Sequence, residues 1–433
     1  MRKTLFSFFV MLWVGTVAAD PVAMGSLPVK PENQVTLSNW TAQPYNHWSF
    51  RNGAIHSSVM VPRGGAIVSL PKAINAEVAT LPVSYQGETA TVRDVLKNDG
   101  TDGVIVLKDG KVVYEEYFGG FGAHDQHMWF SSTKSIVAQA LGLLVAQGKV
   151  AVNEKIAHYI PELIGTHLGK RSVREALNMV TAVDYTENYV NFKPGAVSTE
   201  YFRRLGLMPA YDLMAIDPKK SDTPRGILDF VPLFEANPEL DASHTFEYQS
   251  PNVDVIGWLI TRVSDLPLNK FMAKNLWGKI GAEHDAIFGT DIDYTPIATG
   301  GFSSSLRDFA KVGLVVVNNG YYNGQQIFPE AWVKDTFKLS DAERLHTSRS
   351  VYKDKESAAY DPRLEGYKNF LWVHDSEKRI ATFRGVFGQH LYINQERNLV
   401  IATFSSAKSA SNILRETNKP RLAAFDSIAE SFE

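Results

Sequence analysis

The sequence predicts an α/β fold of the α+β kind, an antiparallel sheet flanked by helices and interrupted by a largely helical insertion. Strand-like runs lie towards both ends of the 433-residue chain, and the segment from about 153 to 291 has a helical pattern. Hairpins and meanders join antiparallel strands without crossover helices. We therefore expect a sheet domain of residues 96–150 and 290–433, a helical domain of residues 151–289, and an N-terminal extended arm of residues 20–95.

The first strands are expected in residues 103–114. Two apolar runs flank Lys108-Asp-Gly-Lys111, and an Asp-Gly pair between such runs is a hairpin signal. A nearly all-apolar run from Ser135 to Gln147 follows and is closed by Gly148. A helix that is apolar on all sides is buried, so this run predicts a core helix.

The later elements follow the same reasoning. Ser305 can cap a helix, with Asp308 at the reciprocal capping-box position. Beyond a charged loop around 340–366, short apolar runs predict strands at 370–373, 380–383, 391–393 and 399–402. These runs need only short connections, which favours a meander.

Composition excludes several classes of function. The chain has 44 basic and 47 acidic residues, a net charge of −3, and only short basic clusters. Nucleic-acid binding needs a concentrated positive surface, so we expect no nucleic-acid partner. Cysteine is absent, which excludes disulfides, a thiol nucleophile and thiolate metal sites. We expect no cofactor and no metal, and the oligomeric state stays open.

The amino end has the pattern of a secretory signal. Arg2-Lys3 precedes an apolar run from Leu5 to Val17, and Val17-Ala-Ala19 supplies small residues for cleavage. No other stretch approaches the roughly 20 apolar residues of a membrane span. The signal, residues 1–19, predicts a periplasmic or secreted protein, and whether it is cleaved or kept as an anchor stays open.

The most informative motif is Ser131-Ser-Thr-Lys134, at the start of the apolar helix. A serine and a lysine three residues apart share one helical face, so the lysine can accept the hydroxyl proton. Unpaired N–H groups of the first turn favour a developing oxyanion. Ser-x-x-Lys also occurs at Ser69, Ser350 and Ser405, and Ser405 is the serious competitor, interpreted as an exposed helix cap. We therefore favour an acyl-transfer enzyme with Ser131 as nucleophile.

A serine hydrolase that uses lysine needs a third group to carry the proton to the leaving group. The candidate is Tyr248, which precedes an apolar helical run from Val253 to Ile260. Tyrosine and lysine side chains in water have pKa values of about 10 and 10.4, and we expect the pocket to lower both. The alternative is that Tyr248 only packs at the end of that helix.

Taken together, an ordered set of motifs resembles the beta-lactamase-related serine hydrolases, and within them the branch of 6-aminohexanoate-dimer hydrolases and carboxylesterases. The motifs are Pro44-Tyr-Asn-His-Trp-Ser-Phe-Arg-Asn52, Met128-Trp-Phe-Ser-Ser-Thr-Lys-Ser135, Tyr159-Ile-Pro-Glu-Leu163, Ala176-Leu-Asn-Met179, Tyr248-Gln-Ser250, Gly300-Gly-Phe…Arg307-Asp308 and Gly385-Val-Phe-Gly-Gln389. They span roughly residues 44 to 405. The resemblance implies the fold shared by beta-lactamases and transpeptidases.

The resemblance also implies roles for single residues. Ser131 becomes the nucleophile, Lys134 its base and Tyr248 the proton shuttle. Ser250 stands where much of the family has asparagine, and Tyr189 corresponds to a tyrosine that handles substrate on a loop, or is only a surface aromatic. Gly385 lets the backbone approach the substrate, and the N–H groups of Val386 and Ser131 become the oxyanion donors.

One departure bears on the substrate. Phe383 takes the position of the lysine in the Lys-Thr-Gly motif of beta-lactamases, and strand alternation directs Arg384 to the opposite face. This argues against a site that binds the carboxylate of a β-lactam or of D-alanine. We expect an exported serine hydrolase of small carboxylic esters or linear amides. The alternatives are a penicillin-binding D-Ala-D-Ala peptidase or beta-lactamase, and a non-catalytic binding protein of the same fold.

Overall fold

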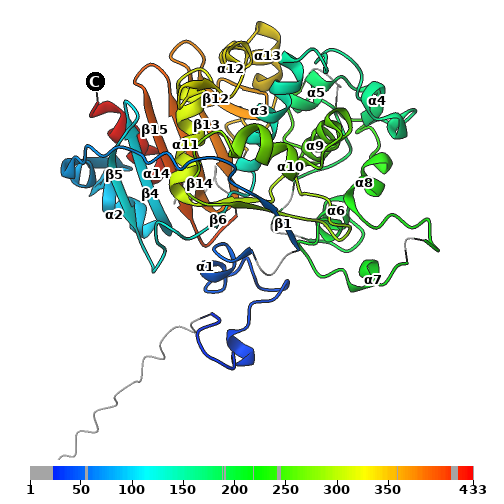
Figure 1. Ribbon diagram of the computed structural model, residues 1–433, viewed down its shortest axis with the longest axis horizontal. Helices are drawn as coiled ribbons and strands as arrows, with labels where there is room; N and C mark the ends of the chain where they lie inside the picture. The colour runs from blue at the N-terminus through cyan, green and yellow to red at the C-terminus, as the bar shows by residue number, and fades with distance from the viewer. Residues whose placement is uncertain are drawn as a thin grey trace, which may run out of the picture.

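The computed structural model describes residues 23–432, except 54–56, 188, 190, 191, 218, 241–244, 358 and 411–417. The predicted signal, residues 1–19, lies outside the described residues. The largest element is a seven-stranded antiparallel sheet in the order β11-β12-β13-β14-β15-β4-β5 (Figure 1). Its strands are β4 (Thr101–Lys108), β5 (Lys111–Tyr117), β11 (Gly366–Lys368), β12 (Leu371–Asp375), β13 (Ile380–Gly385), β14 (Gln389–Asn394) and β15 (Leu399–Ser405).

Strands from early and late parts of the chain meet within this sheet. β15 pairs with β4, so the C-terminal meander continues directly into the N-terminal hairpin. The hairpin turn at Asp109 and Gly110 has positive φ at both residues, 51° and 75°, as a type I′ turn requires. The predicted antiparallel sheet, built from both ends of the chain, is therefore confirmed.

Helices cover both faces of the sheet because its strands alternate. In β4, Val104 and Val106 belong to one apolar cluster with α2 (Val92–Asn98) and α14 (Asn418–Glu430). Ile105 and Leu107 face the larger cluster, which holds α3 (Ser132–Ala146) and α11 (Leu306–Val317). This two-residue period is that of a sheet buried on both sides. Ser305 caps α11 by accepting a hydrogen bond from the Asp308 N–H, as predicted.

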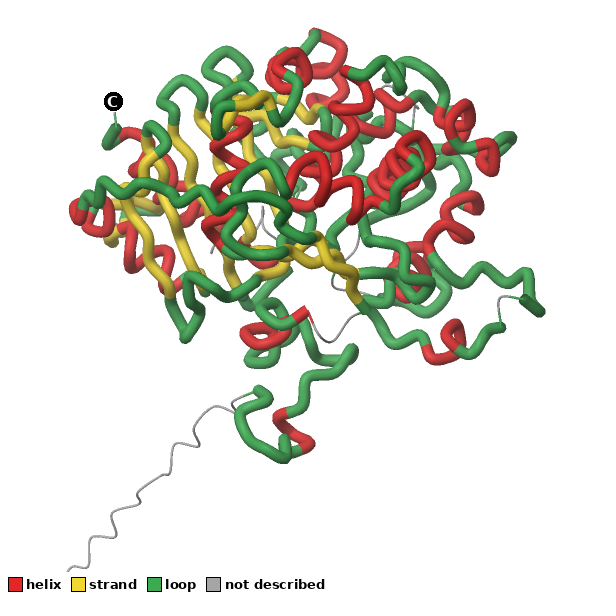
Figure 2. The backbone as a smooth tube through the Cα atoms, in the orientation of Figure 1, coloured by secondary structure: helices red, strands yellow, loops and turns green. Residues whose placement is uncertain are grey.

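Most of the remaining helices gather on one side of the sheet, at the right of Figures 1 and 2, where helix and loop replace strand. This part holds α4 (Ile156–Tyr159), α5 (Val173–Leu177), α6 (Val197–Arg204), α7 (Tyr211–Met214), α8 (Ile227–Phe230), α9 (Pro251–Ser264) and α10 (Leu268–Met272). Two further helices, α12 (Glu330–Phe337) and α13 (Asp341–Ser348), precede β11. The division of the chain into domains at residues 95, 150 and 289 stays a prediction.

A second, four-stranded sheet positions the start of α3. Its order is β1-β7-β8-β6, and all its pairs are antiparallel. The strands are β1 (Ser58–Val61), β6 (His127–Met128), β7 (Ala286–Gly289) and β8 (Phe302–Ser304). Trp129 continues this pairing by donating its N–H to the Phe302 carbonyl at 2.8 Å. The loop that carries Ser131 is therefore held by a sheet on one side and by its own helix on the other.

The remaining short elements lie at the edges. Residues 31–91 hold a short helix, α1 (Asn46–Ser49), and a hairpin of β2 (Pro82–Tyr85) and β3 (Glu88–Thr91), and β9 (Tyr321–Tyr322) pairs with β10 (Gln325–Gln326) after α11. Within the described residues, no helix combines the length and apolar character that crossing a membrane requires.

Candidate active site

The structure brings Ser131 and Lys134 together at the N-terminal end of α3. The Lys134 Nζ donates a hydrogen bond to the Ser131 Oγ at 2.9 Å and another to the Thr299 carbonyl at 2.7 Å. Lys134 is buried, whereas Ser131 is partly exposed. A buried amine therefore contacts an accessible hydroxyl, as the spacing of the motif predicts.

The surroundings of Lys134 favour its neutral form. Burial lowers the pKa of Lys134 to about 8, and the charges of Glu187 and Asp254 act in the opposite direction. An amine that titrates near neutral pH can accept a proton from a nearby hydroxyl. The predicted lowering of the lysine pKa is therefore confirmed, and its main cause is desolvation.

Tyr248 lies directly beside this pair, just before α9. The Lys134 Nζ lies 5.2 Å from the centre of the Tyr248 ring, and the Ser131 side chain is near enough to the phenol to lower its pKa. The ring also stacks on Trp372, with 5.4 Å between centroids. The structure thus assembles all three predicted residues, although they span 117 positions of the sequence.

The pKa of Tyr248 moves in the direction opposite to the prediction. Burial raises the pKa of Tyr248 well above its ordinary value, the Glu187 charge adds to the rise, and the nearby Ser131 side chain opposes it. The prediction was wrong because a phenolate is negative, so desolvation and a nearby carboxylate both oppose it. Tyr248 is therefore a neutral phenol near neutral pH, and it carries a proton that a more basic leaving group can take.

Sequence reasoning missed Glu187, which joins two of the predicted substrate-binding residues. Its Oε1 accepts hydrogen bonds from Tyr189 OH at 2.6 Å and Ser250 Oγ at 2.8 Å. Its Oε2 accepts from the Ser250 N–H at 3.1 Å. The carboxylate therefore holds Tyr189 to the segment that carries Tyr248. No motif marked Glu187: Tyr189 is two residues away, but Ser250, which ties Glu187 to the site, is 63 residues away.

Asp254 is a second residue that the sequence did not indicate. It lies in α9 and is 3% exposed, and its Oδ1 accepts a hydrogen bond from the Thr299 N–H at 3.1 Å. Its Oδ2 accepts a hydrogen bond from the Tyr201 hydroxyl. Because the Thr299 carbonyl contacts Lys134, one residue links the buried carboxylate to the amine. Burial raises the pKa of Asp254 to about 7, and the Lys134 charge opposes that rise.

The end of β13 approaches the loop that precedes Ser131. A Cβ atom at Gly385 would lie 2.3 Å from the Trp129 carbonyl oxygen, so only glycine fits this contact. Val386 follows at once and is partly exposed. The structure therefore places the predicted backbone segments of Ser131 and Val386 beside each other.

The other Ser-x-x-Lys motifs form no comparable pair. Ser405 was predicted to cap an exposed helix, but it is buried as the last residue of β15 and donates to the Gly100 carbonyl at 2.7 Å. The prediction failed because β15 runs further than its apolar core and pairs Ser405 with Thr101 of β4. Ser69 and Lys72 are exposed, and the Ser350 hydroxyl donates to the Thr347 carbonyl.

The histidines of the loop before Ser131 point in different directions. His127 is buried and contacts Asp102 through Nε2 at 3.2 Å, whereas His124 is exposed and faces His284. Across the described ranges, no group of three or more His, Asp or Glu side chains is arranged to hold a metal ion.

With this geometry established, comparison with known proteins gives the family. Residues 89–423 match the family described as Beta-lactamase, which is more than half of the chain. The chain belongs to the beta-lactamase family. It is a serine hydrolase of that family, and it has the fold of beta-lactamases and transpeptidases.

Two relatives share nearly the whole chain. The 6-aminohexanoate-dimer hydrolase of Paenarthrobacter ureafaciens is 26% identical over 381 residues, which cover 88% of this chain and 90% of the relative. A structure titled a putative 6-aminohexanoate-dimer hydrolase from Bacillus anthracis superposes with a TM-score of 0.79 at 24% identity, covering 93% of this chain and 98% of that one. A family VIII carboxylesterase superposes with a TM-score of 0.55 at 14% identity, covering 78% and 96%.

This member of the beta-lactamase family has no cation where the Lys-Thr-Gly lysine of the resemblance would stand. Phe383 is fully buried in the main core. Arg384 forms an ion pair with Asp361 at 2.7 Å and lies over the Trp372 ring, 4.9 Å from its centre. The arginine charge is therefore neutralised within the protein.

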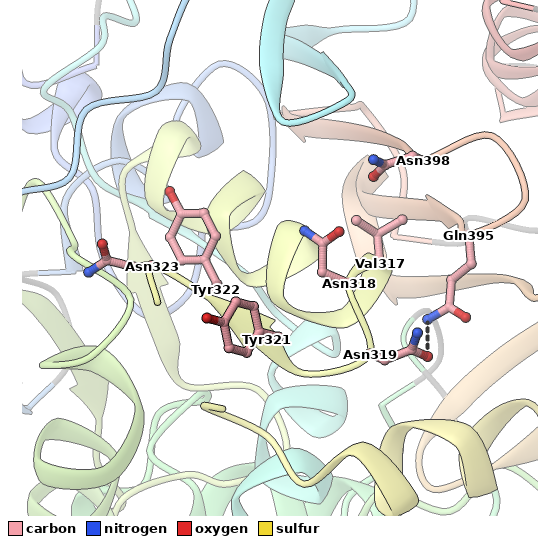
Figure 3. Close-up of a pocket in the computed structure, with 8 residues that line it drawn as sticks. All are labelled: Val317, Asn318, Asn319, Tyr321, Tyr322, Asn323, Gln395 and Asn398. Atoms are coloured by element: carbon pink, nitrogen blue, oxygen red, sulfur yellow. Dashed lines mark hydrogen bonds between the residues drawn. The ribbon is translucent and has the colours of Figure 1, made fainter. Parts of the chain in front are cut away.

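A separate surface depression lies beyond the end of α11 (Figure 3). Its lining residues are Val317, Asn318, Asn319, Tyr321, Tyr322, Asn323, Gln395 and Asn398. None of these side chains is a serine or a charged group, so this depression lacks the chemistry of the Ser131 site.

Proposed function

We propose that the protein is an exported serine hydrolase that cleaves small carboxylic esters or linear amides through an acyl-enzyme on Ser131. One observation carries this proposal: a partly exposed hydroxyl, a buried amine and a buried phenol meet at the first turn of α3. The lowered pKa of Lys134, about 8, makes its neutral amine accessible, and the raised pKa of Tyr248 keeps the phenol protonated.

In the acylation step, the Ser131 Oγ attacks the carbonyl carbon of the substrate and its proton passes to the Lys134 Nζ. The carbonyl π bond opens to an oxyanion, which the N–H groups of Ser131 and Val386 stabilise. Each such donor contributes on the order of 10²–10³ in rate. The oxyanion site therefore depends on the close approach of β13 to the loop before Ser131.

The tetrahedral intermediate collapses when the bond to the leaving group breaks. Tyr248 donates its proton to the departing alkoxide or amine and is reprotonated from the Lys134 ammonium group. The ester of Ser131 remains. A water molecule then attacks this ester, its proton is taken up by the same pair of residues, and the Ser131 oxygen leaves with a proton. The cycle ends with the free acid and the original enzyme.

The substrate class follows from the charges around the site. Arg384 is held by Asp361, and Phe383 is apolar, so neither residue offers a free cation to a substrate carboxylate. The relatives support the same substrate class, because their names are those of a 6-aminohexanoate-dimer hydrolase and a family VIII carboxylesterase. A fluorescent penicillin is accordingly expected to label the protein poorly, and rapid stoichiometric labelling would favour a penicillin-binding enzyme instead.

Export is part of the proposal and rests on residues 1–19 alone. Fusion of this segment to a reporter that is active only outside the cytoplasm tests it. A reporter that stays in the cytoplasm would show that residues 1–19 do not direct export. It would not bear on the proposed chemistry at Ser131.

The chemistry is tested by activity on p-nitrophenyl esters of graded acyl length and on linear amides. Ser131→Ala removes the nucleophile and is expected to abolish turnover. Ser132→Ala is the matched control, since Ser132 is the next residue and is buried inside α3. A Ser131→Ala variant that keeps wild-type turnover would refute the proposal.

A further inference from the structure

The N-terminal segment places one aromatic ring against both walls of the proposed oxyanion site. The Phe50 ring centroid lies 4.7 Å from that of Phe130 and 4.9 Å from that of Phe387. Phe130 directly precedes Ser131, and Phe387 directly follows Val386. The two contacted residues are therefore the immediate neighbours of the two backbone N–H donors.

Both neighbours have an unusual backbone conformation. Phe130 has φ of 47° and Phe387 has φ of 62°, in the left-handed region that bulky residues rarely occupy. Such residues persist only where their surroundings hold them. Here the surroundings are an aromatic clamp of Trp40, Phe50, Phe130 and Phe387, in which Trp40 stacks on Phe130 at 6.1 Å and Phe130 contacts Phe387 at 5.4 Å.

The segment that supplies the clamp is itself anchored at several points. The Phe50 carbonyl accepts a hydrogen bond from the Met128 N–H at 2.8 Å, three residues before Ser131. The Trp40 Nε1 donates to the Leu207 carbonyl at 3.1 Å, and the Asn46 Nδ2 donates to the Ser406 carbonyl at 3.2 Å. These bonds fix residues 40–50 to β6, to the loop after α6 and to the end of β15.

This segment lies outside the part of the chain that matches the family, which begins at residue 89. The family match therefore does not assign it any part in the reaction. The conformation of Phe130 sets the orientation of the peptide that bears the Ser131 N–H. A misplacement of about 1 Å in such a group can cost on the order of 10² in rate.

We propose that Phe50 is a positioning residue, which holds the Ser131 and Val386 N–H groups in register by packing against Phe130 and Phe387. This inference rests on the proposed function, because it takes both N–H groups to be oxyanion donors. The N-terminal segment then completes the oxyanion site of the enzyme. It acts on the transition state more than on the bound substrate, since the oxyanion forms only in the reaction.

The test compares Phe50→Leu with Phe425→Leu in the full chain. Both phenylalanines are 1% exposed, but Phe425 lies in α14 and packs on His390 and Tyr392 on the other face of the sheet. Phe50→Leu is expected to lower kcat on the order of tenfold with little change in KM. It is also expected to weaken inhibition by an arylboronic acid by a similar factor, because the boronate forms a tetrahedral adduct. Phe425→Leu is expected to lower Tm comparably and to keep kcat.

The outcomes separate the role of the clamp from general stability. Equal kcat in Phe50→Leu and wild type, or losses in the two variants that track Tm alone, would overturn the inference. If Phe50→Leu does not fold, Trp40→Phe, which trims the ring stacked on Phe130, is expected to lower kcat in the same direction, and an unchanged kcat there would also overturn it. Failure of the proposed function would appear separately, as wild-type activity in Ser131→Ala with Phe50 intact.

Discussion

The side-chain nitrogen of Lys134 lies 5.2 Å from the centre of the Tyr248 ring and donates a hydrogen bond to the Ser131 hydroxyl. One residue comes from α3 and the other from the segment before α9. Burial disfavours the charged form of each group, so it lowers the pKa of Lys134 and raises the pKa of Tyr248. An amine that loses its proton easily therefore faces a phenol that retains its own.

Replacing Tyr248 with phenylalanine removes the proposed proton donor and keeps the ring that stacks on Trp372. We expect kcat to fall on the order of 10²–10⁴ with a small change in KM, since general acid catalysis contributes about that much. Steady-state kinetics on an amide substrate measure this. Tyr367→Phe is the control, because Tyr367 is a buried phenol whose ring contacts Tyr248 at 6.1 Å. Equal losses in the two variants would contradict the assignment.

The pH dependence of the reaction is expected to follow Lys134. Its pKa of about 8 means that the ammonium form dominates below that pH and the reactive amine above it. We therefore expect kcat/KM to rise about tenfold per pH unit on the acid side and to level above about pH 8. The profile is measured at substrate concentrations far below KM. A profile that is flat between pH 6 and 9 would show that Lys134 is not the base.

Substitution of Asp254 by asparagine is expected to shift the acid side of the kcat/KM profile to lower pH. The Asp254 charge raises the pKa of Lys134, so its removal lets the lysine lose its proton at lower pH. The shift is expected to be on the order of one pH unit, towards acid. Asparagine keeps an acceptor for the Thr299 N–H, which limits structural change.

Glu247→Gln is the control for the Asp254 variant. Burial raises the pKa of Glu247 to about 7, much as for Asp254, but the carboxylates that act on Lys134 are Glu187 and Asp254. The acid side of the kcat/KM profile of Glu247→Gln is expected to match that of the wild type. If the acid side of the profile of Asp254→Asn lies at the same pH as in the wild type, the Asp254 charge does not influence the pKa of Lys134.

Adding a methyl group at Gly385 tests the backbone contact beside the nucleophile. The new Cβ would meet the Trp129 carbonyl at 2.3 Å and force β13 away from the Ser131 loop. We expect Gly385→Ala to lose on the order of 10²–10³ in kcat, the contribution of one oxyanion donor. Gly64→Ala is the control, since its Cβ would have its nearest contact at 3.6 Å. Unchanged turnover in Gly385→Ala would argue against Val386 as a donor.

Local sequence patterns predicted helices and strands well where the residues follow one clear apolar pattern. The apolar run that became α3, the Asp109-Gly110 turn and the four C-terminal strand runs each contain their own signal. The prediction for Ser405 was wrong because β15 continues through this polar residue, which pairs with Thr101 of β4. Only the position of the partner strand reveals this pairing.

Only the site residues that belong to recognisable sequence motifs were predicted. Ser131 and Lys134 share one helical turn, so their contact follows from spacing, and Tyr248 entered through the resemblance. Glu187 and Asp254 have no local signature that ties them to the site, because the contacts that do so, with Ser250 and Thr299, lie 63 and 45 residues away in sequence. Burial of the phenol sets the direction of the Tyr248 pKa, and the Glu187 charge, which the sequence did not mark, adds to the rise.

The measurement that tests the central claim most directly is mass spectrometry of the protein after reaction with a fluorophosphonate. The proposed chemistry predicts one covalent adduct per chain, located on the peptide that contains Ser131, and strongly slowed labelling when Lys134 is replaced by methionine. Labelling at another serine, or an unlabelled chain that still hydrolyses esters, would contradict it.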